Sequence, residues 1–153
     1  MSIPSSVIGQ ELPEVHATIE RGRLRFFAEA IGERNPVYTD LDAARDAGYP
    51  DLPVPPTFLF GLKLDSEDPL GWITDLGVDA RFVLHGTQRF DYERMAFAGD
   101  ELVLRPRIAD VYEKRGGALE FLVVSTEVTR GAEAVAVLSE TIVIRHPEKE
   151  VAA

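Results

Sequence analysis

The sequence predicts an α+β fold in which helices come first and a long antiparallel sheet follows. Apolar residues recur at helical spacing in the first half, whereas the second half alternates apolar and polar residues and is rich in Val, Ile, Phe, Tyr and Thr. Short turn signals separate the predicted strands. At 153 residues the chain is long enough to bury one core, so we expect a single domain over 1–153. Its ends, 1–8 and 147–153, are expected to fray.

The first two predicted helices cover residues 21–32 and 41–47. In the first, apolar side chains form one stripe at helical spacing: Leu24, Phe27, Ala28 and Ile31. Gly32 stands where this helix is expected to end. Asp40 is placed to cap the second helix and Gly48 to close it. A short extended segment precedes the first helix.

A third helix is expected over residues 57–64, after the loop YPDLPVPP. That loop carries four prolines and is therefore not regular structure. In the segment TFLFGLKL every residue except Thr57 and Lys63 is apolar or glycine, which predicts a helix buried on most sides. One more helical turn is expected over residues 69–76.

Four strands are expected in the second half, and Leu122, Val124 and Val128 show the alternation of a half-buried strand. The predicted strands cover residues 81–95, 100–114, 118–130 and 133–145. The short separators AGD, KRGG and RGA predict that consecutive strands are antiparallel neighbours. Such a sheet leaves one edge open, and open edges are commonly closed by a second subunit, so we expect a dimer.

Composition excludes several classes of function. The net charge of −10 argues against a nucleic-acid partner. No apolar run is long enough for a membrane span. The first residues show neither a basic n-region nor a long apolar h-region, which argues against export, so the cytoplasm is the default interpretation. The absence of cysteine removes thiolate chemistry, and the three scattered histidines argue against an all-histidine metal site. We expect neither a metal nor a cofactor.

Three segments, in this order, resemble a known family. FFAEAIGERNPVY is similar to a hydratase motif whose core reads G-D-x-N-P-x-H, AGYPDLPVPPTFLFGL resembles the loop entering a central helix, and HGTQRFDYERMAFAGDEL resembles the next strand and its G-D turn. These features resemble the MaoC-like hot-dog hydratases and dehydratases of enoyl and 3-hydroxyacyl thioesters. The FAS1-like branch, or MaoC N-terminal dehydratase domain, is the most similar. The resemblance implies a hot-dog fold, a long antiparallel sheet wrapped around a central apolar helix.

The resemblance also implies a chemistry that two side chains of the motif perform. An Asp and a His on one loop hold a water, remove its proton and protonate the α-carbon. Backbone N–H groups stabilise the charge that develops on the thioester oxygen. In this sequence Gly32, Asn35 and Pro36 match the motif, whereas Glu33 replaces the Asp and Tyr38 replaces the His.

Both replacements change the reacting groups. Glu33 is still a carboxylate, but its extra methylene shifts the oxygens on a scale to which catalysis is sensitive. Tyr38 is a poor general base, because a phenol has an ordinary pKa of about 10. His85 is a candidate for the missing imidazole, although a single histidine on a strand is more often structural. The alternatives without a catalytic role are a solvated Glu33 and a Tyr38 that packs as an amphipathic aromatic.

Three further residues are assigned to substrate binding by the resemblance: Asn35, Thr57 and Phe58. Thr57 is a candidate backbone donor toward the thioester oxygen, and the alternative is an ordinary residue at a helix start. Asn35 and Pro36 would also form a turn in an unrelated protein.

The leading hypothesis is a subunit of an (R)-specific enoyl-thioester hydratase or 3-hydroxyacyl-thioester dehydratase that acts on acyl-CoA or acyl-carrier-protein substrates. In its sharpest form the chain is the non-catalytic half, paired with a catalytic hot-dog subunit. Two alternatives remain: a homodimer that uses Glu33 with His85 or Tyr38, and an acyl-thioester binding or assembly module without catalysis.

Overall fold

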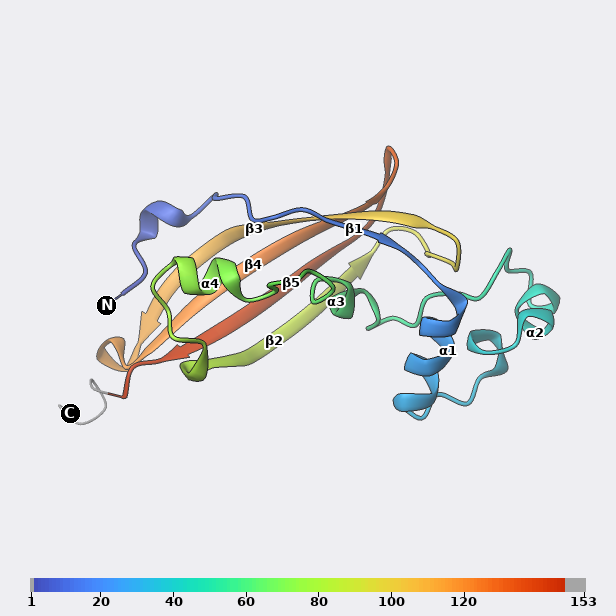
Figure 1. Cartoon of the computed structure of the whole chain (residues 1–153), viewed down its shortest axis with the longest axis horizontal. Coiled ribbons are helices and arrows are strands. Elements are labelled where there is room, and N and C mark those ends of the chain that lie inside the picture. The colour runs from blue at the N-terminus through green and yellow to red at the C-terminus, as the bar shows by residue number, and fades with distance from the viewer. Residues whose placement is uncertain (1, 148–153) are drawn as a thin grey trace.

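The computed structural model describes residues 2–147 and contains one five-stranded antiparallel sheet (Figure 1). The strand order across the sheet is β1-β3-β4-β5-β2. The strands are β1 (Val15–Thr18), β2 (Val83–Tyr92), β3 (Glu101–Lys114), β4 (Leu119–Arg130) and β5 (Glu133–Arg145). The predicted α+β class and all four predicted long strands are confirmed. The two edges are the short strand β1 and the ten-residue strand β2.

The pairing of β2 differs from the prediction. Strands β3, β4 and β5 are consecutive antiparallel neighbours as expected, but β2 pairs with β5 and not with β3. The expectation that the AGD turn joins two paired strands was wrong. The segment between β2 and β3 is hydrogen-bonded to other parts of the backbone. The Ala96 carbonyl accepts from the Val54 N–H, and the N–H groups of Ala98 and Gly99 donate to the carbonyls of Leu52 and Ile19. This segment therefore crosses the end of the sheet.

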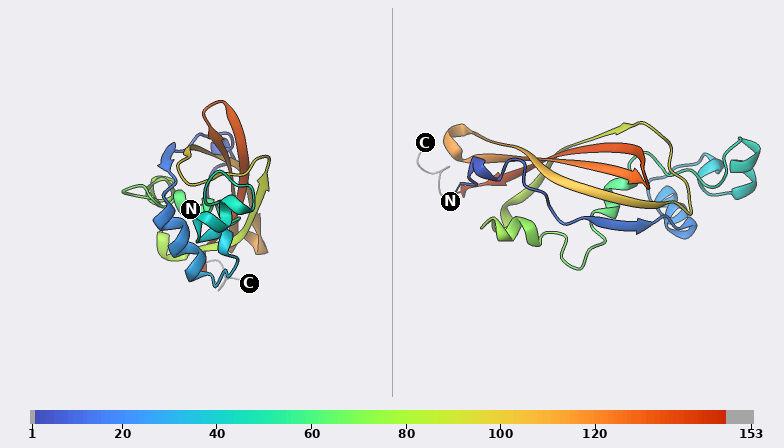
Figure 2. Two further views of the ribbon diagram at one scale, coloured as in Figure 1. Left: turned by 90° about the vertical axis from the view of Figure 1, so that its right-hand side faces the viewer. Right: turned by 90° about the horizontal axis from the view of Figure 1, so that it is seen from above.

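The helices lie on one face of the sheet and beyond one of its ends (Figures 1 and 2). The α-helices are α1 (Arg21–Ala30), α2 (Leu41–Asp46), α3 (Leu59–Leu62) and α4 (Gly71–Asp75). The 3-10 turns are η1 (Ser5–Val7), η2 (Pro36–Tyr38), η3 (Ala80–Phe82) and η4 (Arg115–Gly117). Helices α3 and α4 lie against the sheet, whereas α1 and α2 lie past its end.

The local sequence accounts for the ends of the first two helices. Gly32 adopts φ +72° just after α1, and Gly48 adopts φ +89° after α2, a region that favours glycine. The Asp40 side chain accepts from the N–H groups of Asp42 and Ala43 at the start of α2. These three predicted boundaries are confirmed.

Helix α3 is shorter than predicted, one turn instead of eight residues. The N–H groups of Phe58, Gly61, Lys63 and Leu64 each donate to the carbonyl three residues earlier, which is the hydrogen-bond pattern of a 3-10 turn. The turn is buried as expected, with Leu59 and Leu62 fully inaccessible. A single turn leaves part of the concave face of the sheet uncovered by helix.

Two apolar clusters form the core. One lies between α1, α3 and the sheet, and includes Leu24, Leu59, Leu62, Leu104 and Leu138. The other lies between α4 and the sheet, and includes Ile73, Ile108, Leu122, Val124 and Ile142.

The N-terminal segment, expected to fray, contacts the sheet in the structure. Ile3 is buried and its N–H donates to Glu120 Oε1 at 2.7 Å. The Gly9 N–H donates to the Ile108 carbonyl at 2.8 Å. At the other end, residues 148–153 of the segment expected to fray lie outside the described range. None of the helices within residues 2–147 is long and apolar enough to span a membrane.

We expect Gly86→Ala to lower the free energy of unfolding by about 1–3 kcal/mol. Gly86 lies at a register shift in β2, and a Cβ there would meet the Thr141 carbonyl oxygen at 2.8 Å and Val143 Cγ2 at 3.0 Å. The backbone oxygen cannot move without disturbing the β2–β5 ladder. Urea denaturation measures the difference.

Gly22→Ala is the matched control, because Gly22 lies within α1 and its added Cβ would meet no atom within 4 Å beyond its chain neighbours and its own helix backbone. This substitution is expected to raise the free energy of unfolding by about 0.5–1 kcal/mol. Equal effects of the two substitutions would contradict the close approach at Gly86.

Candidate active-site loop

The loop GERNPVY joins α1 to α2 beyond the end of the sheet, and its sequence determines its shape. The Glu33 N–H donates to the Ala28 carbonyl at 2.9 Å, directly after the left-handed Gly32. Asn35 Oδ1 accepts from the Val37 N–H at 3.2 Å and caps the 3-10 turn that Pro36 begins. The matching residues of the motif therefore form a capped turn.

The carboxylate of Glu33 is turned toward its own loop. Its Oε1 accepts from the backbone N–H groups of Arg34 and Asn35, both at 2.8 Å. One of its two oxygens is thus occupied in holding the loop backbone. Arg25 fixes the end of the loop against α1, since its Nε donates to the Thr39 carbonyl at 2.8 Å.

Tyr38 is a partly buried phenol beside this carboxylate. Removal from water raises the pKa of Tyr38 above its ordinary value, and the negative charge of Glu33 and the proximity of Tyr49 raise it further. The phenol therefore stays protonated at neutral pH. At this position the chain provides a hydrogen-bond donor and not a base.

Tyr92, at the end of β2, also belongs to this region and was not singled out from the sequence. Its hydroxyl donates to the Pro56 carbonyl at 2.7 Å. Burial raises the pKa of Tyr92 to about 12, with a further contribution from Tyr38. The residue as a whole is 39% exposed. Three segments thus meet here: the loop, the proline pair before α3, and the end of β2.

The raised pKa values predict a specific alkaline titration. The chain has four tyrosines, and we expect Tyr92 to ionise last, at about pH 12. Its pKa is higher in the folded state than in an unfolded chain, so the protonated phenol of Tyr92 contributes to the free energy of unfolding. That contribution is complete below about pH 10 and is lost as the pH rises toward 12. Absorbance of the phenolate measures the titration, and Tyr92→Phe should remove its last step. An unchanged last step in that variant would assign it to another tyrosine.

The predicted substrate-binding residues lie around the same meeting point. Thr57 is exposed and adjoins Pro56, and its N–H has no hydrogen-bond partner among residues 2–147. Phe58 is 5% exposed and packs edge-on against Phe27 at 5.4 Å between ring centroids. Phe58 therefore has a clear packing role, and direct contact with substrate stays a prediction for both residues.

His85 is not brought to the loop within one chain. It lies on β2 seven residues before Tyr92, roughly 20 Å along the strand. Its ring stacks on Phe60, with centroids 5.2 Å apart and an interplanar angle of 12°. Within one chain the candidates therefore form two groups, Glu33 with Tyr38 at the end of the sheet and His85 near its middle.

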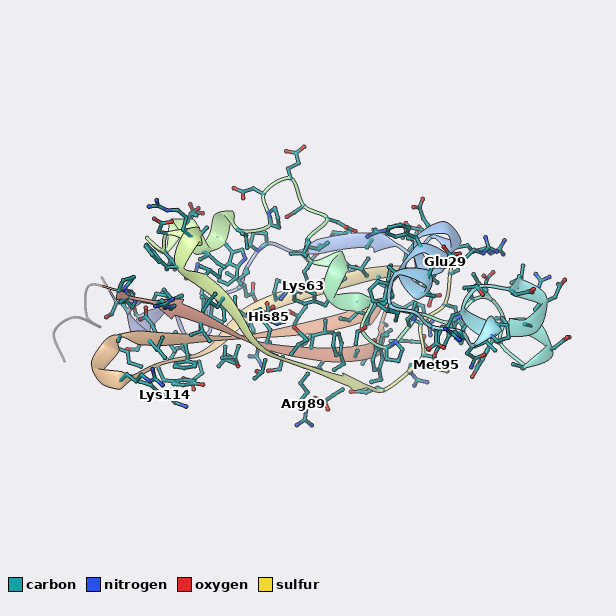
Figure 3. All side chains as sticks on the ribbon, turned by 90° about the horizontal axis from the view of Figure 1, so that it is seen from below. Glu29, Lys63, His85, Arg89, Met95 and Lys114 are labelled. Atoms are coloured by element: carbon teal, nitrogen blue, oxygen red, sulfur yellow. The ribbon has the colours of Figure 1, made fainter. Side chains whose placement is uncertain are left out.

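The His85 ring borders a cavity of about 210 Å³ that lies beside α3 on the concave face of the sheet. Apolar side chains form most of its wall, among them Phe60, Trp72 and Ile142. Lys63, at the end of α3, reaches into this wall and forms an ion pair with Glu140 of β5 (Figure 3). Over residues 2–147 no group of three or more His, Asp or Glu side chains is placed to hold a metal ion.

The chain resembles proteins of known family and known fold. A model of the FAS1-like dehydratase domain region matches residues 6–138. A UPF0336 protein of Saccharopolyspora erythraea is 37% identical over 147 residues, which cover 95% of this chain and 93% of that protein. A UPF0336 protein of Streptomyces coelicolor is 38% identical over 118 residues, or 76% of this chain and 78% of that protein.

Solved structures share the architecture. A chain of the HadBC 3R-hydroxyacyl-ACP dehydratase complex of Mycobacterium tuberculosis is 25% identical, with a TM-score of 0.73 over 89% of this chain and 96% of that chain. The R-hydratase PhaJ1 of Pseudomonas aeruginosa, 18% identical, shares the fold with a TM-score of 0.67 over 95% of this chain and 87% of that chain. Because the family model and the relatives cover most of its length, this chain belongs to the FAS1-like dehydratase domain family and has the hot-dog fold.

Proposed function

We propose that this chain is the non-catalytic hot-dog subunit of an (R)-specific enoyl-thioester hydratase or 3-hydroxyacyl-thioester dehydratase. One observation carries the proposal. The loop keeps the capped turn of the hydratase motif, but it presents a protonated phenol at position 38 and directs Glu33 Oε1 to its own backbone. A partner subunit with an intact Asp and His would perform the proton transfers.

The required chemistry explains why the phenol matters. Hydration needs one group that takes a proton from water as its oxygen attacks the β-carbon, and one that protonates the α-carbon. An imidazole exchanges protons near neutral pH, whereas the raised pKa of Tyr38 holds its proton in place. His85 would have to act from a second subunit, because within one chain it lies roughly 20 Å along β2 from Tyr92.

The open edge of β2 is the surface on which we place the partner. It is ten residues long, and Leu84 on it is half exposed. Unpaired strand edges are templates for another strand. The similar structures include complexes of two different chains, HadBC and the ChsH1-ChsH2 complex of Mycobacterium tuberculosis, the latter 25% identical with a TM-score of 0.71 over 89% of each chain. Those pairings support a heterodimer here.

In this proposal the cavity beside α3 accommodates part of the acyl chain of a CoA or carrier-protein thioester. Its apolar wall suits a hydrocarbon, and it adjoins β2 at Val83, Leu84 and His85. A substrate held at the subunit interface would reach it from that side.

The test is hydration of crotonyl-CoA, followed as loss of enoyl absorbance. We expect the purified chain alone to show no turnover above the uncatalysed rate, and the complex co-purified from the native host to be active. Light scattering should give the complex a mass of about twice the 16.9 kDa chain.

Glu33→Gln separates the competing interpretations. In the active complex this substitution should leave turnover unchanged, because the partner supplies the base. Robust turnover by the pure chain that is lost in Glu33→Gln would overturn the proposal and make Glu33 the base of a homodimer. Tight acyl-CoA binding without turnover, with or without the co-purified partner, would favour a binding module.

A further inference from the structure

The cavity beside α3 has a largely buried ion pair in a mostly apolar wall. Lys63 and Glu140 are only 13% and 8% exposed at their side chains. Apart from the indole of Trp72, the other polar side chains that line the cavity are exposed: Glu14, Ser66, Asp68 and His85. The ion pair is therefore the one charged feature at depth among the described lining residues.

The ammonium of Lys63 has unused hydrogen-bonding capacity. A lysine ammonium carries three N–H donors. Glu140 is its one hydrogen-bond partner among residues 2–147. Lys63 lines the cavity together with Phe60 and Ile142, whose side chains offer no acceptor, and the acceptors of the exposed lining residues make no hydrogen bond to it among residues 2–147. A buried donor without an acceptor is costly, so an oxygen atom placed here would be bound favourably.

Nearby polar groups on the sheet are also incompletely satisfied. Gln88 is the cross-strand partner of Glu140, and its Oε1 is buried without a hydrogen-bond partner. Thr126 lies on the neighbouring strand β4, fully buried, and its Oγ1 also has no partner. Unpaired buried polar atoms are rare in folded proteins. Gln88 and Thr126 lie on the strands beside Glu140, although neither lines the cavity itself.

We infer that this cavity binds a neutral chain with one oxygen acceptor, a keto or hydroxyl oxygen placed against Lys63. A carboxylate is disfavoured, because it would add net negative charge to an already neutral pair and would have to pass the acidic side chains of Glu14 and Asp68. A cavity of about 150 Å³ holds benzene, so 210 Å³ accommodates roughly six to eight chain carbons. The identification of the bound hydrocarbon as part of an acyl group rests on the proposed function. The preference of the cavity for a neutral ligand with one oxygen acceptor does not rest on it.

The experiment compares two probes of the same shape, 2-heptanone and 2-methyl-1-heptene, which differ only in C=O against C=CH₂. Trp72 lines the cavity and is the one tryptophan of the chain, so its indole N–H gives a single reporter signal in NMR titrations of the full-length protein. The ratio of ketone to alkene affinity should fall by about ten- to a hundred-fold in Lys63→Met/Glu140→Leu, the loss of one hydrogen bond to a charged donor.

Lys114→Met is the matched control, because Lys114 lies over Tyr112 and Phe121 and does not line the cavity. It should leave the affinity ratio unchanged. An equal ratio in wild type and the double variant would overturn the inference, as would failure of both probes to shift the Trp72 signal. Neither probe is a thioester, so the two proposals are tested independently. If the co-purified complex showed no hydratase activity, the proposed function would be overturned and this inference would stand.

Discussion

Replacing Lys63 alone by Met is expected to lower the free energy of unfolding by about 3–5 kcal/mol, among the largest effects of any single substitution in this chain. Glu140 lies on the inner face of β5, is 6% exposed, and has Lys63 as its one ion-pair partner among residues 2–147. Removing the ammonium leaves a buried carboxylate without a counter-charge. Urea denaturation followed by circular dichroism at neutral pH measures the loss.

The double substitution Lys63→Met/Glu140→Leu is expected to restore most of that stability. Exchanging a buried ion pair for apolar side chains of similar volume is often neutral or stabilising, because the cost of removing two charges from water disappears. Phe60 and Ile142, which line the same cavity, are apolar and suit the new side chains. The two substitutions should therefore be strongly non-additive.

Glu140→Leu alone is expected to cost less than Lys63→Met alone. Lys63 lies at the end of α3, and the next residues, 64–66, are exposed, so its flexible side chain can turn its ammonium toward water. Glu140 is held in the middle of a strand and has no such route. Equal costs of the two single substitutions, or additivity in the double variant, would show that the two charges do not depend on each other.

The contrast between Lys63 and its partner shows where prediction from sequence stops. Lys63 is conspicuous as the one charged residue in an apolar segment, but nothing local indicates Glu140, which lies 77 residues later.

The strand boundaries were predicted well, residues 133–145 being those of β5, because alternation of apolar and polar residues is a local pattern. The placement of β2 beside β5 was missed, since a short turn signal says nothing of the hydrogen bonds that tie residues 96–99 to Val54, Leu52 and Ile19.

The same limit applies to the candidate site. The capped turn at Asn35 and Pro36 follows from residue types and was predictable. The meeting of Tyr38 with Tyr92 and Pro56 joins three segments distant in sequence, so only the tertiary structure reveals it. An available signal was the position of Tyr92 inside the third segment of the family resemblance, where it would have been a reasonable candidate.

Glu33→Asp/Tyr38→His is expected to raise crotonyl-CoA hydration by the chain alone by about a hundred-fold or more, the usual contribution of a positioned acid–base group. The substitution recreates the Asp and His of the motif on a loop whose turn is already formed by Gly32, Asn35 and Pro36. An imidazole at position 38 would exchange protons near neutral pH, which the phenol with its raised pKa does not. Initial rates with and without the two substitutions measure the gain.

Two controls isolate the cause of any gain. Tyr38→His alone adds the imidazole but keeps the longer carboxylate, which the loop N–H groups of Arg34 and Asn35 hold, so it should recover only part of the activity. Glu33→Gln/Tyr38→His keeps the imidazole and removes the charge, so it should recover little. If the folded variant Glu33→Asp/Tyr38→His stays inactive while binding acyl-CoA, restoring the two side chains is not sufficient for catalysis. The Tyr92 and Pro56 side of the site, or the absent partner, would then control where the thioester lies relative to the loop.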